Sequence, residues 1–182
     1  MSLKPQVLDR LLLSKSFLDR VRFQPIAPND RHVLAGNIIA AHDAAELAIA
    51  TIADELGCSP ANGGKTYSID YFDPIEKAMN LAAHGRDYFR QLNIVRNQLK
   101  HQGLFPDSRQ WARVAESVHQ HVTKWCSNYL KIHFGQLDES VLLLDADVKR
   151  PYDEAKQNLS AGNFQKSLEK IDGENLGSET PD

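Results

Sequence analysis

The segment LNIVRNQLKHQG, residues 92–103, gathers side chains that could handle a phosphate group. Arginine carries a planar fork of donors that fits phosphate oxygens, and histidine exchanges a proton near neutral pH. On a helix, His101 neighbours Asn97, whereas Arg96 lies about 140° around the axis from His101. One phosphate can therefore touch both Arg96 and His101 only if it lies across the helix, or if a second subunit contributes.

These residue types suit RNA cleavage without a metal. His101 could act as general base on a 2′-hydroxyl or protonate the leaving oxygen, and Arg96 could stabilise the charged phosphorane. The alternative is a solvated helix face, because single arginine and histidine residues are common on helices. Composition alone favours the solvated face over catalysis.

The charge pattern of this helix is one-sided. A helical wheel over residues 86–101 places most of the polar side chains within one arc of roughly 140°. Phe89 is the only apolar residue in that arc, and no acidic residue lies on it. Solvated faces usually mix acids with bases, since like charges repel. The pattern predicts a local anion-binding surface in a chain of net charge -3. We call the following residues the basic arc: Arg86, Arg90, Asn93, Arg96, Asn97, Lys100 and His101.

Apolar periodicity predicts the helices that would position this segment. The core side of the motif helix is expected to hold Tyr88, Leu92, Val95 and Leu99. No segment shows sustained strand alternation, so the fold class is all-α, an antiparallel helical bundle with short connections. The predicted helices cover 5–22, 31–56 after the N-cap Asp30, 73 to a break at 84–85, 86 to the stop at Gly103, and 107 or 108 to 134.

The start at Asp73 and Pro74, with Glu76 following, matches a capping box. Trp111 and Trp125 share a face and are expected to pack as core or dimer anchors. For Phe89, dimer packing is preferred over contact with a base.

Three histidines need a separate interpretation. His119 and His121 point to different helix faces, so we expect surface positions and no shared metal. His42 could support the active face from the second helix, or be an ordinary satisfied histidine. Glu46, one turn further, could pair with His42 or with a basic residue of the motif helix.

Composition indicates one soluble, cytoplasmic protein of 182 residues with 42% hydrophobic residues. Cys58 and Cys126 have neither a zinc-type spacing nor a disulfide framework, so no metal or other cofactor is expected. The first residues do not resemble a secretory signal. Asn37, His42 and Asp43 interrupt the most apolar run, which argues against a membrane span.

The chain is expected to divide into a helical bundle over 1–145, a helical hairpin over 146–171 and a disordered acidic tail over 172–182. The hairpin would place Tyr152, Ala155, Leu159, Phe164 and Leu168 at helical spacing. Such a unit cannot bury its own apolar face alone, so a protein partner is possible there.

The motif RNQLKH resembles the R-x4-6-H signature of the HEPN superfamily, in which the residue after the arginine is commonly Asn, as Asn97 is here. The resemblance spans roughly residues 30–133, with an alanine-rich earlier helix and the motif near the end of a later one. It implies a metal-independent ribonuclease that dimerises to form a composite site, which would resolve the geometric difficulty above. Arg96 and His101 would be catalytic, with Asn97 orienting or stabilising. From the charge pattern of the helix, and not from the resemblance, Arg86, Arg90, Asn93 and Lys100 are expected to bind RNA.

The resemblance has one departure. HEPN toxins controlled by a nucleotidyltransferase carry Tyr two residues after the histidine, where this chain has Gly103. A role in stress response, phage defence or a toxin–antitoxin pair is the family-level expectation. Because many HEPN domains have lost activity, a non-catalytic protein-interaction module and an RNA-binding domain without cleavage stay as alternatives.

Overall fold

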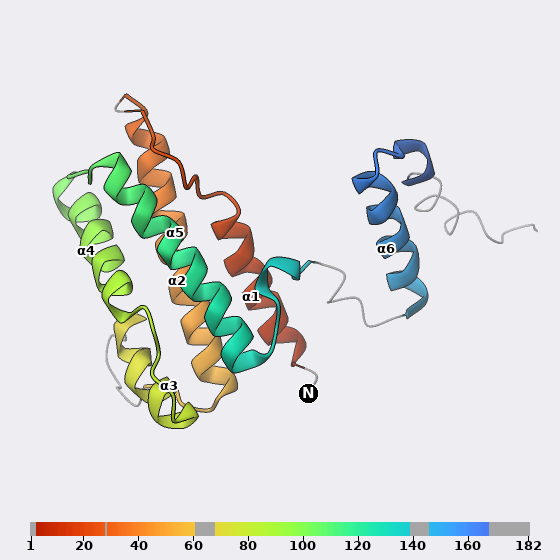
Figure 1. The fold of residues 1–182 in the computed structure, drawn as a ribbon, viewed down its shortest axis with the longest axis horizontal. Helices are drawn as coiled ribbons and strands as arrows, with labels where there is room; N and C mark the ends of the chain where they lie inside the picture. The colour runs from red at the N-terminus through yellow and green to blue at the C-terminus, as the bar shows by residue number, and fades with distance from the viewer. Residues whose placement is uncertain (1–2, 28, 61–67, 139–145, 168–182) are drawn as a thin grey trace, which may run out of the picture. The chain divides into compact units, whose positions relative to one another are not determined.

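The computed structural model describes residues 3–27, 29–60, 68–138 and 146–167 (Figure 1). Within these ranges the chain forms helices and no strand, so the all-α prediction is confirmed. The chain divides into two compact units, residues 1–137 and 138–182.

The first unit is a bundle built around α2 (Arg31–Glu55), the longest helix described. α2 contacts α1, α4 and α5, and Figure 1 shows these helices running alongside it. Its packing surface is rich in alanine, which allows neighbouring helices to approach closely. Around α2 lie α1 (Pro5–Leu18), η1 (Ser68–Tyr71), α3 (Phe72–Met79), α4 (Arg86–Gln102), α5 (Ser108–Trp125), the π turn η2 (Cys126–Leu130) and the 3-10 turn η3 (Phe134–Gln136).

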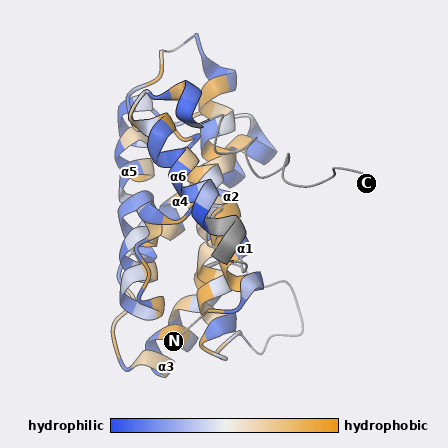
Figure 2. Ribbon diagram, turned by 90° about the vertical axis from the view of Figure 1, so that its right-hand side faces the viewer, coloured by the Kyte–Doolittle hydropathy of each residue, from blue (hydrophilic) through white to orange (hydrophobic). Residues whose placement is uncertain are grey.

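Hydropathy follows this arrangement. Figure 2 shows apolar residues along α1 and α2 and frequent polar residues along α4 and α5. By length and composition α2 could cross a membrane, alone among the described helices, but half of its most apolar window is buried inside the protein. Core helices of soluble proteins pass the same test.

A buried hydrogen bond also joins α1 to α2 within the bundle. Ser14 Oγ on α1 donates to the Ala44 carbonyl of α2 at 2.8 Å.

An aromatic cluster of Phe72, Phe89 and Trp125 joins α3, α4 and α5. The ring of Phe89 lies 4.8 Å from that of Trp125 and 5.5 Å from that of Phe72. Trp125 Nε1 donates to the His84 carbonyl at 2.9 Å, which satisfies the indole while it is buried. Trp111 is buried as well, so the core role predicted for both tryptophans is confirmed.

The cluster corrects the expected orientation of α4. Phe89 was placed on the exposed arc as a base or dimer contact, but only 1% of it is exposed. Tyr88, expected in the core, is 42% exposed. α4 is therefore turned so that Phe89 packs against Phe72 and Trp125, while Leu92, also expected in the core, is buried as predicted.

Most helix ends lie close to the predicted positions. Gly85 (φ 99°) precedes α4, and Gly103 (φ 65°) closes it by donating to the Leu99 carbonyl at 3.1 Å. Asp107 Oδ1 caps α5 by accepting from two backbone N–H groups. α3 starts earlier than predicted, at Phe72, and Asp73 is no cap. α1 ends at Leu18 rather than 22, and α5 gives way to the π turn after Trp125.

The two cysteines lie in different surroundings. Cys126 is fully buried, and burial raises the pKa of its thiol to about 12. Cys58 is partly exposed at the end of α2, where burial and the charge of Asp54 raise its pKa. Both are free thiols.

In the second unit, α6 (Ala146–Ser160) is followed by a turn and a helical segment at 164–167. Ser167 Oγ donates to the Ala155 carbonyl at 2.8 Å, and Lys156 Nζ lies 2.8 Å from Asp138 Oδ2. Ala155 is buried, whereas Leu159 and Phe164 of the predicted hairpin are 52% and 65% exposed. Leu168 and the predicted acidic tail lie outside the described residues.

We expect Gly85→Ala to destabilise the first unit. A Cβ at this position would lie 2.1 Å from His121 Cδ2, and the backbone has a positive φ. Strain and steric overlap should together cost about 2–4 kcal/mol in the free energy of unfolding, measured by chemical denaturation.

Gly103→Ala is the matched control, since its φ is also positive but nothing lies within 4 Å of an added Cβ. Its cost should be clearly smaller. Equal losses in the two variants would show that the approach of His121 to Gly85 contributes nothing.

Candidate functional site

The first half of the basic arc is neutralised by carboxylates. Arg86 pairs with Asp73, and its Nη2 lies 3.2 Å from Glu76 Oε2, both on α3. The hydrogen bond to Asp73 raises the pKa of Arg86, and its guanidinium also lies over the ring of Phe72. Arg86 thus has a structural role in joining α3 to α4.

Arg90 is similarly occupied. Its Nη1 lies 3.1 Å from Asp87 Oδ1, one turn earlier on α4. The expectation of a face without acids is therefore wrong for this half of the arc. A wheel drawn for one helix does not include acids from a neighbouring helix, and Asp87 lies just outside the arc while its side chain reaches into it.

The second half of the arc, formed by Arg96, Asn97, Lys100 and His101, keeps its positive charge. Among the described residues, none of these side chains forms an ion pair with a carboxylate. Arg96 is half-buried, and its Nη1 donates to Asn97 Oδ1 at 3.4 Å. Asn97, Lys100 and His101 are exposed near the end of α4. An approaching phosphate would therefore meet Arg96 and Lys100, which pair with no carboxylate in the part of the chain that the structure describes.

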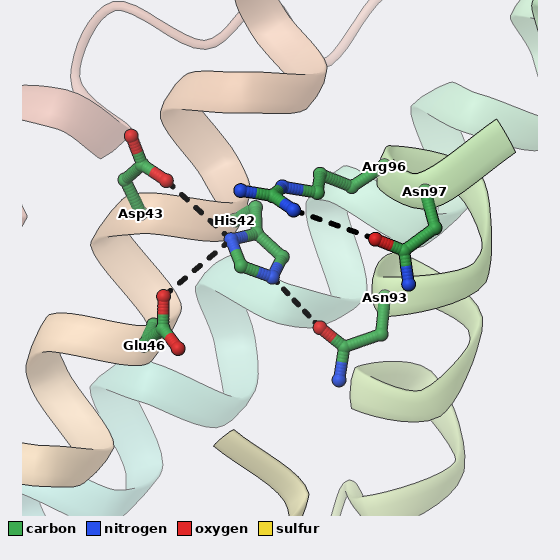
Figure 3. A network of polar contacts seen from close by, with 6 residues as sticks. All are labelled: His42, Asp43, Glu46, Asn93, Arg96 and Asn97. Carbon is green, nitrogen blue, oxygen red and sulfur yellow. Dashed lines mark hydrogen bonds and ion pairs between the residues drawn. The ribbon is translucent and has the colours of Figure 1, made fainter. Parts of the chain in front are cut away.

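A polar network links α2 to Asn93, the residue of the basic arc that lies between its two halves (Figure 3). His42 on α2 is only 6% exposed, and its Nε2 lies 2.7 Å from Asn93 Oδ1 on α4. Its Nδ1 lies 3.4 Å from Asp43 Oδ1 and 3.8 Å from Glu46 Oε2. His42 thus contacts the motif helix, as expected if it supports that face, but the same hydrogen bond also satisfies it as an ordinary buried histidine. The amide oxygen of Asn93, expected to contact RNA, is engaged by the buried His42.

Arg96 is positioned by the same two helices. Figure 3 shows its side chain extending from α4 towards α2, on the side where His42 lies. Within the described residues no hydrogen bond joins Arg96 or Asn97 to His101. The structure thus pairs Arg96 with Asn97 and Asn93 with His42, while His101 lies in the last turn of α4, one turn after Asn97.

His119 and His121 of α5 were predicted to be surface residues, but both are partly buried and pack against aromatic rings. His121 is half-buried beside Gly85, with its ring centroid 5.2 Å from that of Tyr88 and 6.4 Å from that of Trp125. His119 packs edge-on against Phe23 at 5.3 Å. Burial, followed by the charges of Lys124 and His84, lowers the pKa of His121. The partner rings Phe23 and Tyr88 lie far from α5 in the sequence, so no pattern within α5 predicts these contacts.

Comparison with known proteins identifies no relative: no family model matches the chain, and neither do any curated proteins or solved structures. The functional argument therefore rests on the residues and their geometry.

The lowered pKa of His121 predicts an acid-sensitive stability. Below the reference value of 6.5, the unfolded chain takes up a proton at this position more readily than the folded chain does. The free energy of unfolding should therefore fall as the pH decreases through 6.5 towards the lower folded-state pKa. Denaturant titrations across this range would measure the slope.

His121→Gln should flatten part of that slope, whereas replacement of the exposed His133 by Gln should leave it nearly unchanged. If both variants show the wild-type pH dependence, protonation of His121 does not contribute to it.

Proposed function

We propose that the chain is an endoribonuclease of the HEPN type, which cleaves RNA without a metal and works as a homodimer in the cytoplasm. The observation that carries the proposal is the division of the basic arc. Two of its arginines are paired with acids, while Arg96, Lys100 and His101 form no ion pair with a carboxylate among the described residues.

The proposed reaction is an internal transfer at phosphorus. His101 accepts the proton of the 2′-hydroxyl, the 2′-oxygen bonds to phosphorus, and the bond to the 5′-oxygen breaks. The leaving 5′-oxygen takes up a proton from water, giving a 2′,3′-cyclic phosphate and a 5′-hydroxyl. Arg96, oriented by Asn97, stabilises the negative charge of the phosphorane. Lys100 adds attraction for the RNA backbone.

A dimer would place a second copy of α4 opposite the first. The wheel separates Arg96 from His101 by about 140°, so one copy does not readily present both to a single phosphate. Two exposed apolar residues flank the motif, Ile94 at 50% and Leu104 at 54%. Such residues are suited to an interface in which the same patch of both subunits meets.

The main alternative is binding of RNA without cleavage, which the same cations, free of ion pairs within the described ranges, also support. It shares the salt-sensitive affinity of the enzyme but not its products.

The exposed Leu159 and Phe164 of the second unit favour another alternative, in which this unit binds a protein partner. That function would not depend on His101 or Arg96.

The test is incubation of the purified protein with a labelled structured RNA in EDTA. We expect cleavage with 2′,3′-cyclic phosphate ends. Both His101→Ala and Arg96→Ala should reduce the rate by at least about 100-fold, because each removes a group that acts in the transition state. Light scattering on the same samples should show that the variants keep the oligomeric state of the wild type.

His133→Ala and Arg20→Ala are matched controls, since both residues are exposed and lie outside the basic arc. They should cleave at the wild-type rate. Absence of cleavage on several RNAs, with binding that weakens as salt increases, would favour the RNA-binding alternative. Equal cleavage by wild type and His101→Ala would point to a contaminating nuclease.

A further inference from the structure

The first turn of α2 lies beside the last turn of α4. Figure 1 shows the two helices running in opposite directions, and two contacts fix their register. Midway along the pair, His42 Nε2 lies 2.7 Å from Asn93 Oδ1. Near the start of α2, the guanidinium carbon of Arg31 lies 5.6 Å from the centroid of the Phe105 ring, which follows closely after the end of α4. The two helices therefore stay close together up to the turn that carries His101.

This register places His32 of α2 at nearly the same level as His101 of α4. His32 lies ten residues before His42 in the sequence, which is a rise of about 15 Å along the helix. His101 lies eight residues after Asn93, a rise of about 12 Å in the same direction because the helices are antiparallel. The two histidines thus differ by only about 3 Å along the helix axes.

Both histidines also lie on the same face of the helix pair. At about 100° per residue, each is turned by about 80° from the contact between His42 and Asn93. Because both helices are right-handed and antiparallel, the two turns lead to the same outer side of the pair. The same geometry places Ile39 and Ile94 on that side, and they are 49% and 50% exposed. Both histidines are exposed as well.

The two imidazoles flank a space that a phosphodiester can enter. The axes of packed helices are about 8–10 Å apart, so side chains directed to the same outer side stand across a narrow gap. In the part of the chain that the structure describes, neither His32 nor His101 forms a hydrogen bond or an ion pair. Asn97, one turn before His101, accepts a hydrogen bond from Arg96 Nη1 at 3.4 Å. The gap thus lies next to the groups assigned to the phosphate.

We propose that His32 is the general acid that protonates the leaving 5′-oxygen. The attacking and leaving oxygens of a phosphoryl transfer lie roughly in line, on opposite sides of phosphorus. A base on α4 and an acid on α2 match that arrangement. The inference rests on the proposed ribonuclease function, and in that reaction His32 supplies the proton in place of water. Both histidines belong to one chain, whichever subunit supplies Arg96.

The proton transfers balance within the pair. Neutral His101 takes the proton of the 2′-hydroxyl as the 2′-oxygen bonds to phosphorus. The imidazolium of His32 gives its proton to the 5′-oxygen as the bond from that oxygen to phosphorus breaks. The step leaves His101 protonated and His32 neutral, and proton exchange with water restores both.

The experiment compares two leaving groups in EDTA. One substrate is the labelled structured RNA, and the other is the same RNA with sulfur in place of the bridging 5′-oxygen at the mapped cleavage position. A 5′-alkoxide needs a proton to leave, whereas a 5′-thiolate does not. His32→Ala should cleave the oxygen-linked RNA at least about 100-fold more slowly than wild type, but the sulfur-linked RNA within about threefold of it.

His101→Ala should lose at least about 100-fold on both substrates, because the 2′-hydroxyl needs a base in either case. His133→Ala, a change of an exposed histidine outside the helix pair, should match wild type on both. The two substrates also control for folding, since a damaged variant loses activity on both.

Three outcomes would overturn the role of His32. A wild-type rate for His32→Ala on the oxygen-linked RNA, beside an inactive His101→Ala, removes His32 from the reaction and leaves the proposed function standing. Equal losses of His32→Ala on the two RNAs show a structural role only. Absence of cleavage by the wild type on both RNAs removes the ribonuclease function itself, and the role of His32 with it.

Discussion

The packing of Phe89 between Phe72 and Trp125 determines the orientation of α4, and the polar surface depends on that orientation. These aromatic contacts involve three helices and are directional, since rings meet edge-on or tilted at centroid distances of about 5 Å. With Phe89 directed inward, Arg86 lies over the ring of Phe72 and within reach of the acids of α3. The same rotation places Asn93 against His42 of α2. The aromatic cluster thus divides α4 into two parts. In the first part the arginines pair with acids, and in the second part the cations form no such pair among the described residues.

Much of the fold was predictable because the strongest signals are local. Asp107 and Gly103 act at helix ends through backbone geometry that involves only a few neighbouring residues. The rotation of α4 was not predictable in this way. A wheel gives the relative directions of Tyr88 and Phe89, but which of them is buried depends on rings supplied by Phe72 and Trp125. The capping box expected at the start of α3 is absent for a related reason, since the partners of Glu76 come from later segments. Glu76 accepts a hydrogen bond from Ala83 N and pairs with Arg86.

The candidate site shows the same contrast. That Arg96, Asn97 and His101 share one helix follows from the sequence, and their spacing is a local property. Whether an arginine of α4 pairs with an acid depends partly on acids in other segments. Arg86 pairs with acids of α3, whereas Arg96 pairs with none among the described residues. His42 gave a weak signal as a polar residue in an apolar helix. Its partner Asn93 is fifty-one residues away in the sequence, and no periodicity within α2 could have identified it.

Gly103 ends α4 two residues after His101, and this gives the two principal side chains different mobility. Helix ends open at a lower free energy than helix centres, because fewer hydrogen bonds and fewer packed side chains hold them. Arg96 lies a further turn into the helix, half-buried against α2, whereas His101 belongs to the exposed last turn. In the proposed reaction, the phosphate-binding Arg96 would thus be held in place, while the proton-transferring His101 would follow a moving oxygen by small openings of the helix end. Such a division of rigidity would let one site accept RNA segments of differing shape without losing its hold on the phosphate.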